Sequence, residues 1–248
     1  MKYELSKIST KHGIFFVYPN DAIAQHIIKN GSWEEHFISI VKNLVKKDDW
    51  VIDCGANFGY NSVILGKIIG EHGKLFCFEP QKIIYEQLIK NLDLNGIKNY
   101  EAYNNAIDVI SEKVVNLNPV NYESSWVNIG DTGIGVGGEK TKTMSLDDLN
   151  FERVDFIKLD IQGYELYAMM GGEKTLRKHV PHIFIEIENH QLKRYNLNSD
   201  DILNFLKKLN YNIFRIITPS YRDDCICIHE SKINCYQKIS SIVSLESL

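Results

Sequence analysis

Acidic side chains stand at the ends of short apolar runs in several parts of the 248-residue chain. The first case is residues 51–59, in which Asp53 precedes a turn with glycines at positions 55 and 59. Glycine lets the backbone approach a ligand closely, and a carboxylate at the end of a strand can face an ammonium group. A dinucleotide site would need a G-x-G-x-x-G turn, and Asp53 would repel a pyrophosphate. The turn therefore favours a nucleoside cofactor with an amino acid moiety, and a plain structural turn is the alternative.

The end of the second apolar run, residues 74–78, agrees with this interpretation. Glu79 and Pro80 follow the run, and an acidic residue at the end of a second parallel strand is placed to bind both ribose hydroxyls. In the alternative, Glu79 caps the helix that begins near Gln81. Asn105 and Ala106 follow the third run, where they can contact an adenine edge. These features together indicate S-adenosylmethionine. The residues expected to contact it are Asp53, Gly55, Ala56, Asn57, Gly59, Asn61, Ser62, Glu79, Pro80, Asn105, Ala106 and Asp160.

Two later apolar runs, residues 154–159 and 182–187, end in acidic residues that are placed to take part in a reaction. Asp160 follows the first run, and Glu186 lies on the polar face of the second. Acidic side chains on an inner strand are costly unless they are paired, ligating or solvated in a cleft. The residues expected to form a catalytic group at one rim are Asp160, Glu165, Glu186 and His190. The alternative for Asp160, Glu165 and Glu188 is helix capping or salt bridging to Lys158 or Lys193.

The apolar runs alternate with segments of helical periodicity, which predicts an α/β fold with a parallel sheet and helices on both faces. Strands are expected at 50–54, 74–78, 100–104, 154–159, 182–187, 211–217 and 225–229. Helices are expected at 21–28, 32–47, 60–69, 81–95 and 164–179, the last interrupted at Gly171-Gly172, and after a cap at Ser199. A hairpin is expected near residues 14–18, and the short link between the last two strands predicts an antiparallel pair at one edge.

Residues 107–148 interrupt the alternation and contain five glycines, which predicts a long loop with turns. Such a loop is either a binding loop or a surface insertion. The residues expected to bind the substrate are Trp33, Glu34, Trp126, Asn128, Gln162 and Tyr164.

Composition limits the class of protein. A formal net charge of −4 gives no basic field for a phosphate backbone, so nucleic acid is not the expected partner. Five scattered cysteines predict a reducing compartment and no disulfide framework. The first residues lack the apolar core of a signal peptide, and no stretch approaches the roughly 18 apolar residues of a membrane span. We therefore expect a cytoplasmic protein without a membrane span.

Six motifs appear in an order that resembles the FkbM-type methyltransferase family. They are VIDCGANFGYNS from residue 51, FEP at 78–80, NLDLNG at 91–96, SLDDL at 145–149, VDFIKLDIQGYE at 154–165 and IFIEIE at 183–188. The resemblance covers roughly residues 33–190. It implies a Rossmann-like class I methyltransferase fold with a seven-stranded, mostly parallel sheet. It also implies O-methylation of a sugar, glycan or other small natural product, with Asp160 beside the transferred methyl group.

The regions outside these motifs divide the chain into three expected parts. Residues 33–230 form the methyltransferase domain, residues 1–32 a hairpin and helix extension, and residues 231–248 a tail. The extension and the tail are candidates for covering the substrate or for forming a homodimer.

Two routes fit the loss of the proton from an acceptor hydroxyl. A general base among Asp160, Glu165, Glu186 and His190 can take it. Alternatively, Mg²⁺ or Mn²⁺ held by Asp160 and Glu186 can lower the pKa of the acceptor. The absence of a tight D-x-D pair at either strand end favours the base. Alternative functions are methylation of a non-sugar acceptor such as a polyketide or lipid, and an inactive binding module with the same fold.

Overall fold

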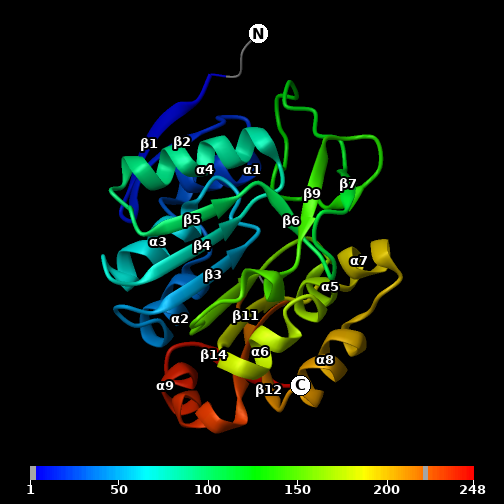
Figure 1. The fold of residues 1–248 in the computed structure, drawn as a ribbon. Coiled ribbons are helices and arrows are strands. Elements are labelled where there is room, and N and C mark those ends of the chain that lie inside the picture. Colours follow the sequence, from blue (N-terminus) through cyan, green and yellow to red (C-terminus); the bar gives the residue numbers. More distant parts are fainter. Residues whose placement is uncertain (1–3, 220–222) are drawn as a thin grey trace.

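The computed structural model describes residues 4–219 and 223–248, which fold around one large twisted sheet (Figure 1). Its eight strands follow the order β14-β12-β13-β11-β10-β3-β4-β5. The strands are β3 (Trp50–Cys54), β4 (Lys74–Phe78), β5 (Tyr100–Tyr103), β10 (Phe156–Leu159), β11 (His182–Glu186), β12 (Tyr211–Ile217), β13 (Asp224–His229) and β14 (Ser244–Ser247). The five strands from β5 to β11 are parallel, and β13, β12 and β14 add antiparallel pairs. The predicted α/β class and the antiparallel edge are confirmed.

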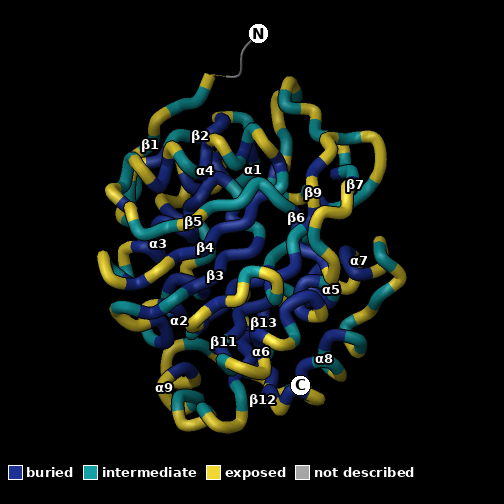
Figure 2. Tube along the Cα trace, viewed as in Figure 1, coloured by how far each residue is buried: buried dark blue, intermediate teal, exposed yellow. Residues whose placement is uncertain are grey.

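Helices cover both faces of the sheet, as predicted. They are α1 (Ala22–Asn30), α2 (Glu35–Leu44), α3 (Tyr60–Ile69), α4 (Lys82–Leu94), α5 (Glu165–Met170), α6 (Glu173–His179), α7 (Asn189–Leu192), α8 (Ser199–Lys208) and α9 (Tyr236–Ser240). Successive strand residues face opposite sides, so Val51 packs in the core with α2, α3 and α4, and Ile52 in the core with α5, α6 and α8. The central strands are consequently buried along their length (Figure 2).

The structure corrects two expectations about strands. The sheet has eight strands in the described residues, because β14 from the C-terminal tail pairs with β12. Residues 105–144 also form a small sheet in the order β6-β9-β7-β8. Its strands are β6 (Asn105–Ile107), β7 (Val114–Leu117), β8 (Ile134–Gly135) and β9 (Lys140–Met144). β9 reads Lys-Thr-Lys-Thr-Met, so its buried residues are the two threonines, Met144 is partly buried, and no apolar alternation marks it as a strand.

The helix boundaries follow the capping chemistry closely. Asp21 caps α1 by accepting a hydrogen bond of 3.0 Å from the backbone N–H of Ala24, as predicted. α8 begins one residue earlier than expected, because Asn198 is the cap and forms a capping box with Asp201. Ser32 does not cap α2; Glu34 precedes that helix in a left-handed conformation, with φ 48°.

The N-terminal hairpin of β1 (Ser6–Thr10) and β2 (Gly13–Val17) packs against α4. The backbone N–H of Phe16 donates to Asn91 Oδ1 at 2.7 Å, and Gln87 Nε2 donates to the Phe16 carbonyl at 2.7 Å. The chain then runs beside the segment that precedes β8, where the N–H of Ala22 donates to the carbonyl of Val127. The N-terminal extension is therefore part of the same hydrophobic core. No helix within the described ranges is long and apolar enough to cross a membrane.

Candidate functional site

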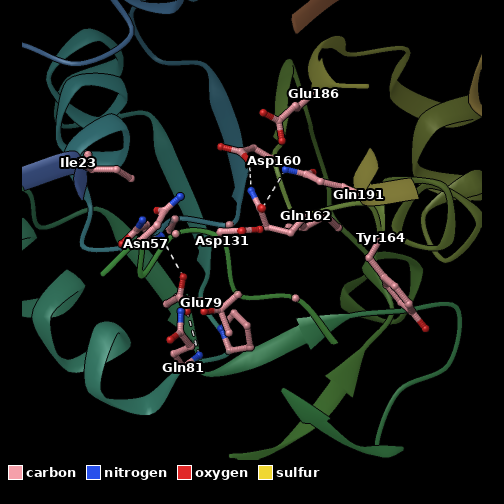
Figure 3. Close-up of a pocket in the computed structure, with 18 of the residues that line it drawn as sticks. Ile23, Asn57, Glu79, Gln81, Asp131, Asp160, Gln162, Tyr164, Glu186 and Gln191 are labelled. Carbon is pink, nitrogen blue, oxygen red and sulfur yellow. Dashed lines mark hydrogen bonds between the residues drawn. The ribbon is translucent and has the colours of Figure 1, made fainter. Parts of the chain in front are cut away.

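A cavity of about 620 Å³ opens where the parallel strands end (Figure 3). Most of the residues that the sequence indicates line it. They are Trp33, Glu34, Gly55, Ala56, Asn57, Asn61, Glu79, Pro80, Asn105, Ala106, Trp126, Asn128, Asp160, Gln162, Tyr164, Glu186 and His190. The cavity wall does not include the other four, which are Asp53, Gly59, Ser62 and Glu165.

The turn after β3 packs tightly against the neighbouring strand ends. The backbone N–H groups of Gly55 and Ala56 both donate to the carbonyl of Phe78 at 3.0 Å. Gly55 has φ 80°, and a Cβ atom there would lie 1.9 Å from the backbone oxygen of Asp160. Only glycine fits this approach. At Gly59, with φ 91°, a Cβ atom would lie 2.8 Å from Leu88 Cδ1, so Gly59 supports the helix packing and lies outside the cavity wall.

Glu79 lies at the end of β4 with only 4 % of its surface exposed. Its Oε2 accepts the backbone N–H of Asn57 at 3.0 Å, and its Oε1 accepts the N–H of Gln81 at 2.8 Å (Figure 3). Burial raises the pKa of Glu79 to about 7, although these two hydrogen bonds favour the ionised form. Glu79 thus fixes the loop before α4 and lines the cavity, and its carboxylate accepts no N–H group from within α4.

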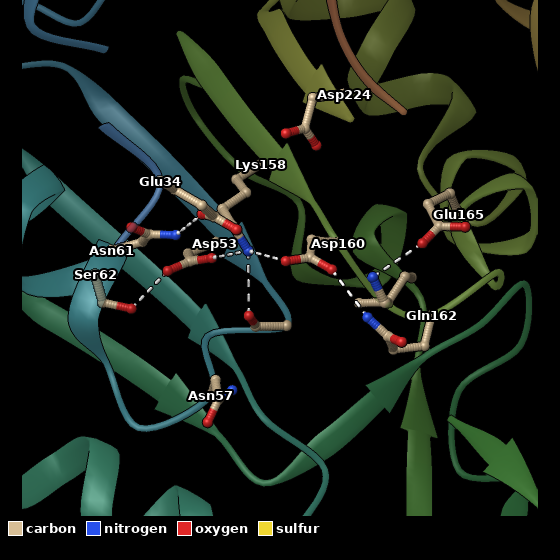
Figure 4. Close-up of polar contacts among 12 residues, drawn as sticks. Glu34, Asp53, Asn57, Asn61, Ser62, Lys158, Asp160, Gln162, Glu165 and Asp224 are labelled. Carbon is tan, nitrogen blue, oxygen red and sulfur yellow. Dashed lines mark hydrogen bonds and ion pairs between the residues drawn. The ribbon is translucent and has the colours of Figure 1, made fainter. Parts of the chain in front are cut away.

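A buried ion-pair network lies behind the turn and is centred on Lys158, whose side chain is 2 % exposed (Figure 4). Lys158 Nζ lies 3.5 Å from Asp53 Oδ1 and 3.2 Å from Asp160 Oδ2, and it donates to the Gly55 carbonyl at 3.3 Å. Burial lowers the pKa of Lys158, but Asp160, Asp53 and Glu34 outweigh it and hold that pKa above its ordinary value. Ser62 Oγ donates to Asp53 Oδ2 at 2.6 Å. Asp53 and Ser62 therefore support the turn from behind.

Asp160 joins this network to the cavity. Gln162 Nε2 donates to Asp160 Oδ1 at 3.2 Å, and Gln191 Nε2 donates to Gln162 Oε1 at 2.9 Å (Figure 3). Gln162 has a left-handed backbone with φ 61°, as do Asn57 and Glu34 at the same cavity. Such conformations cost energy for residues other than glycine, and they cluster at functional sites.

Glu165 lies at the start of α5 and is almost fully buried. Its Oε1 accepts the backbone N–H groups of Ile161 and Gly163, at 2.9 and 3.2 Å. Burial raises its pKa to about 7. The structure thus places Glu165 behind the turn that carries Asp160, where its carboxylate binds backbone N–H groups of that turn and does not cap α5.

The acidic end of the cavity contains two carboxylates that lie opposite each other on antiparallel strands, Glu186 of β11 and Asp224 of β13. Asp224 Oδ2 lies 2.6 Å from His36 Nε2, whereas Glu186 Oε2 is buried and has no hydrogen-bond partner among residues 4–219 and 223–248. Burial, followed by repulsion from Asp160 and Asp224, raises the pKa of Glu186 to about 10. Glu34 accepts from Asn61 Nδ2 at 2.8 Å, and burial together with Asp160 raises its pKa to about 7.

The outer part of the cavity is aromatic and polar. Trp33 meets His26 edge-on with ring centroids 4.9 Å apart, and Trp126 is 59 % exposed beside the opening. Arg194 Nη2 pairs with Asp131 Oδ1 at 2.9 Å on the same wall. The side chain of His190 is 78 % exposed at the rim, 4.0 Å from a Glu188 oxygen. The exposed ring of Trp126 is thus available to a ligand that enters from solvent, whereas Trp33 is partly buried against the core.

The part of the chain that carries the strand-end carboxylates matches a known protein family. The family model for the methyltransferase FkbM domain matches residues 53–213, which is more than half of the chain. The chain belongs to the FkbM methyltransferase family. The resemblance to this family that the sequence motifs indicate is therefore confirmed. The matched range includes the turn after β3, Glu79, Asp160 and Glu186.

Solved structures of methyltransferases are similar to this FkbM chain at low sequence identity. Methyltransferase FkbM from Methylobacillus flagellatus KT is 21% identical, with a TM-score of 0.48 over 73% of this chain and 44% of that one. This chain thus spans less than half the length of that protein. An S-adenosylmethionine-dependent O-methyltransferase from Thermotoga maritima is 14% identical, with a TM-score of 0.48 over 90% and 76% of the two chains. No curated protein matches the chain.

Asp224 and its pairing with His36 are not indicated by the sequence of this FkbM-family chain, and Lys158 is expected only as a salt-bridge partner. Asp224 and His36 are 188 residues apart and meet only because β13 and the start of α2 converge on β11. The one local signal was Lys158 itself, a charged residue inside the apolar run Phe-Ile-Lys-Leu. A charge at such a position requires buried partners.

The ligand geometry gives the divalent-ion route no support. Within residues 4–219 and 223–248, no three side chains of histidine, cysteine, aspartate or glutamate are arranged to hold a metal ion. Asp160 and Glu186 line the same cavity, but neither belongs to such a group within these ranges.

Proposed function

We propose that this methyltransferase transfers a methyl group from S-adenosylmethionine to a hydroxyl group of a sugar or glycan. The observation that carries the proposal is the composition of one cavity. The cavity brings the turn at Gly55 and the buried carboxylate of Glu79 together with the carboxylates of Asp160 and Glu186 and the exposed ring of Trp126.

The inner part of the cavity fits the proposed cofactor. Small-molecule sites have volumes of roughly 300–1,000 Å³, and the volume of about 620 Å³ lies in this range. Glu79 at the end of β4 would accept the two ribose hydroxyls, and Asn105 and Ala106 would contact the adenine. Asp160, on the side of Gly55, would face the ammonium group of the amino acid moiety. This assignment uses Asp160 where the sequence suggested Asp53, because Asp53 is enclosed by Lys158 and Ser62.

S-adenosylmethionine, when bound, supplies a methyl group activated by its positive sulfonium. The protein must orient the acceptor hydroxyl and take up its proton. Glu186 is the proposed proton acceptor, because it lines the cavity and its Oε2 has no hydrogen-bond partner in the described part of the chain. With a pKa raised to about 10, Glu186 is protonated without the cofactor and cannot take up a proton in that form. The sulfonium charge of the bound cofactor would favour the ionised form, which is the form that accepts the proton. Asp160 is held by Lys158 and Gln162, which suits an orienting carboxylate.

The outer part of the cavity fits a sugar. The indoles of Trp33 and Trp126 present apolar faces, against which the C–H face of a pyranose can stack. The side-chain amides of Asn128 and Gln162 can donate to and accept from hydroxyl groups. Aromatic faces beside amides are the combination that a polyol requires.

The test measures formation of S-adenosylhomocysteine with a panel of acceptors, followed by mass spectrometry of the product. The panel contains free sugars and glycans beside hydroxylated polyketides and lipids of similar size. A gain of one methyl group on a sugar supports the proposal, and transfer only to a polyketide or lipid replaces the acceptor class. Binding of S-adenosylmethionine without any transfer would indicate an inactive binding module. Exhaustive chelation with EDTA, followed by Mg²⁺ addition, tests the divalent-ion route separately.

A further inference from the structure

The ammonium group of Lys158 lies between the turn after β3 and the carboxylate of Asp160 (Figure 4). An ammonium group has three N–H donors. Its surroundings offer three acceptors within 3.5 Å, namely the Gly55 carbonyl, Asp160 Oδ2 and Asp53 Oδ1. The Gly55 carbonyl and Asp160 Oδ2 accept hydrogen bonds from Lys158, whereas Asp53 Oδ1 accepts none within the described residues and is an ion-pair partner at 3.5 Å.

These acceptors belong to two neighbouring strands of the sheet. Lys158 of β10 stands beside Asp53 of β3 in the parallel register, and Gly55 begins the turn that follows β3. The missing Cβ of Gly55 lets the turn approach the backbone oxygen of Asp160. The same two chain segments are thus joined twice, once by backbone packing and once by the Lys158 ammonium.

We propose that Lys158 is a positioning residue, which holds the turn at residues 55–59 and the carboxylate of Asp160 in the arrangement that binds S-adenosylmethionine. This inference rests on the proposed cofactor. Lys158 acts through Gly55 and Asp160, and it takes no proton from the acceptor. The carboxylates around it keep its pKa above the ordinary value, which agrees with a permanently charged group.

A purely electrostatic role would have the opposite effect on binding. S-adenosylmethionine carries a sulfonium charge that S-adenosylhomocysteine lacks. If Lys158 acted only through its own positive charge, its removal would strengthen binding of the cationic ligand relative to the neutral one. If Lys158 positions the turn and Asp160, its removal weakens binding of both ligands.

Isothermal titration with S-adenosylmethionine and S-adenosylhomocysteine tests this role without any acceptor. We expect K158M to raise both dissociation constants by about tenfold, which is a typical coupling between contacting residues. In a D160N background the same substitution should have a much smaller effect, of about threefold or less, because its main target is already altered. Equal factors in both backgrounds, unchanged affinities, or tighter binding of S-adenosylmethionine alone would each overturn the proposal.

Stability has to be separated from positioning, because K158M leaves Asp53 buried without an ion-pair partner. The double variant K158M/D53N removes that charge and is titrated in parallel. K158R should recover part of the affinity, since it keeps the charge. K74M is the matched control, because Lys74 lies at the exposed start of β4 over the ring of Trp50.

Two further outcomes are decisive. A lower urea midpoint with unchanged dissociation constants in K158M and K158M/D53N would show a structural role only and overturn the inference. If the wild-type protein binds neither ligand, the proposed cofactor fails, and this role of Lys158 fails with it. If the wild-type protein binds both ligands and K158M binds them equally well, the proposed role of Lys158 fails and the proposed cofactor stands.

Discussion

As the proposed acceptor of the ribose hydroxyls, Glu79 is predicted to give cofactor binding most of its pH dependence. Its pKa is raised to about 7 by burial, so the carboxyl becomes protonated as the pH falls through 7. A protonated carboxyl is a poorer acceptor for two ribose hydroxyls. We expect the dissociation constant of S-adenosylmethionine to rise by roughly tenfold between pH 8 and pH 6, in line with a charge-assisted hydrogen bond.

Glu79→Gln checks the source of that dependence by titration at both pH values. The variant should bind weakly at pH 8 and lose most of the change with pH. A shallower slope should persist, because Glu34 at the same cavity has a pKa raised to about 7 as well. Glu86→Gln, on the exposed side of α4, should bind like the wild type. An unaltered pH profile in Glu79→Gln would contradict the assignment.

The raised pKa of Glu186 predicts that the protein becomes less stable as the pH rises. The ordinary pKa of a glutamate is 4.5, and in the folded protein burial with Asp160 and Asp224 raises that of Glu186 to about 10. Between these values the folded protein binds more protons at this position than the unfolded chain does. The contribution of this bound proton to the free energy of unfolding is therefore fully present below about pH 4.5 and is lost as the pH rises towards 10. This loss of stability at high pH comes from the residue that the proposed reaction needs as a proton acceptor.

Glu186→Gln should consequently raise the free energy of unfolding at pH 8.5, by an amount on the order of 1 kcal/mol, and change it little at pH 5. Methyl transfer should fall by about 100-fold, a typical loss for a general base. Urea unfolding at the two pH values and the acceptor assay measure these effects. Glu152→Gln, an exposed glutamate, serves as the control. A variant less stable than the wild type at pH 8.5 would be evidence against a raised pKa.

At the scale of elements, the strands of the large sheet were predictable because most are apolar along their whole length. β3, β4 and β11 are buried on both faces, so their sequences mark them without any alternation. The small sheet was not predictable, since β9 owes its strand conformation to pairing with β6 and β7. The alternating lysines and threonines of β9 do not form the apolar alternation that predicts a strand. The same reason hid Asp224 and His36, which are brought together only by the tertiary fold.

Asp21 joins two elements that cover the cavity. Its Oδ2 caps α1 through Ala24, and its Oδ1 accepts the backbone N–H of Ile129 at 3.1 Å, with 3 % of the residue exposed. Asp21→Ala leaves both N–H groups without an acceptor, which should destabilise the protein by about 1–3 kcal/mol. Exchange of the Ile129 amide hydrogen should accelerate more than exchange in β3.

Thermal unfolding and hydrogen exchange followed by mass spectrometry check this prediction. Asp200→Ala is the matched control, because Asp200 is exposed in the first turn of α8 and is not its cap. Asp200→Ala should change the free energy of unfolding by no more than about 0.5 kcal/mol. Equal protection of Ile129 in Asp21→Ala and the wild type would mean that the loop before β8 is held by other contacts.

At the scale of the whole molecule, the large sheet ends on one side in a strand that the sequence did not indicate. β14 covers β12 through four paired residues, and Arg215 Nη1 lies 3.3 Å from Glu246 Oε2 across the pair. The N–H of Leu248 also donates to the carbonyl of Ile213. A short outer strand with charged and polar side chains protects the more apolar strand behind it from pairing with other chains.

Removal of residues 244–248 should therefore change how the protein associates more than how it binds its cofactor. β12 would become the edge strand and expose the backbone groups of Phe214 to Ile217, which pair with β14 in the intact chain. We expect the truncated protein to form larger species with rising concentration, as measured by light scattering after size exclusion. Glu246→Gln keeps the strand and should elute like the full chain. The cavity lies on the parallel strands, so truncated and full-length protein should bind S-adenosylmethionine within about threefold of each other. Unchanged elution of the truncated protein at every concentration would show that β14 is dispensable for protecting this edge.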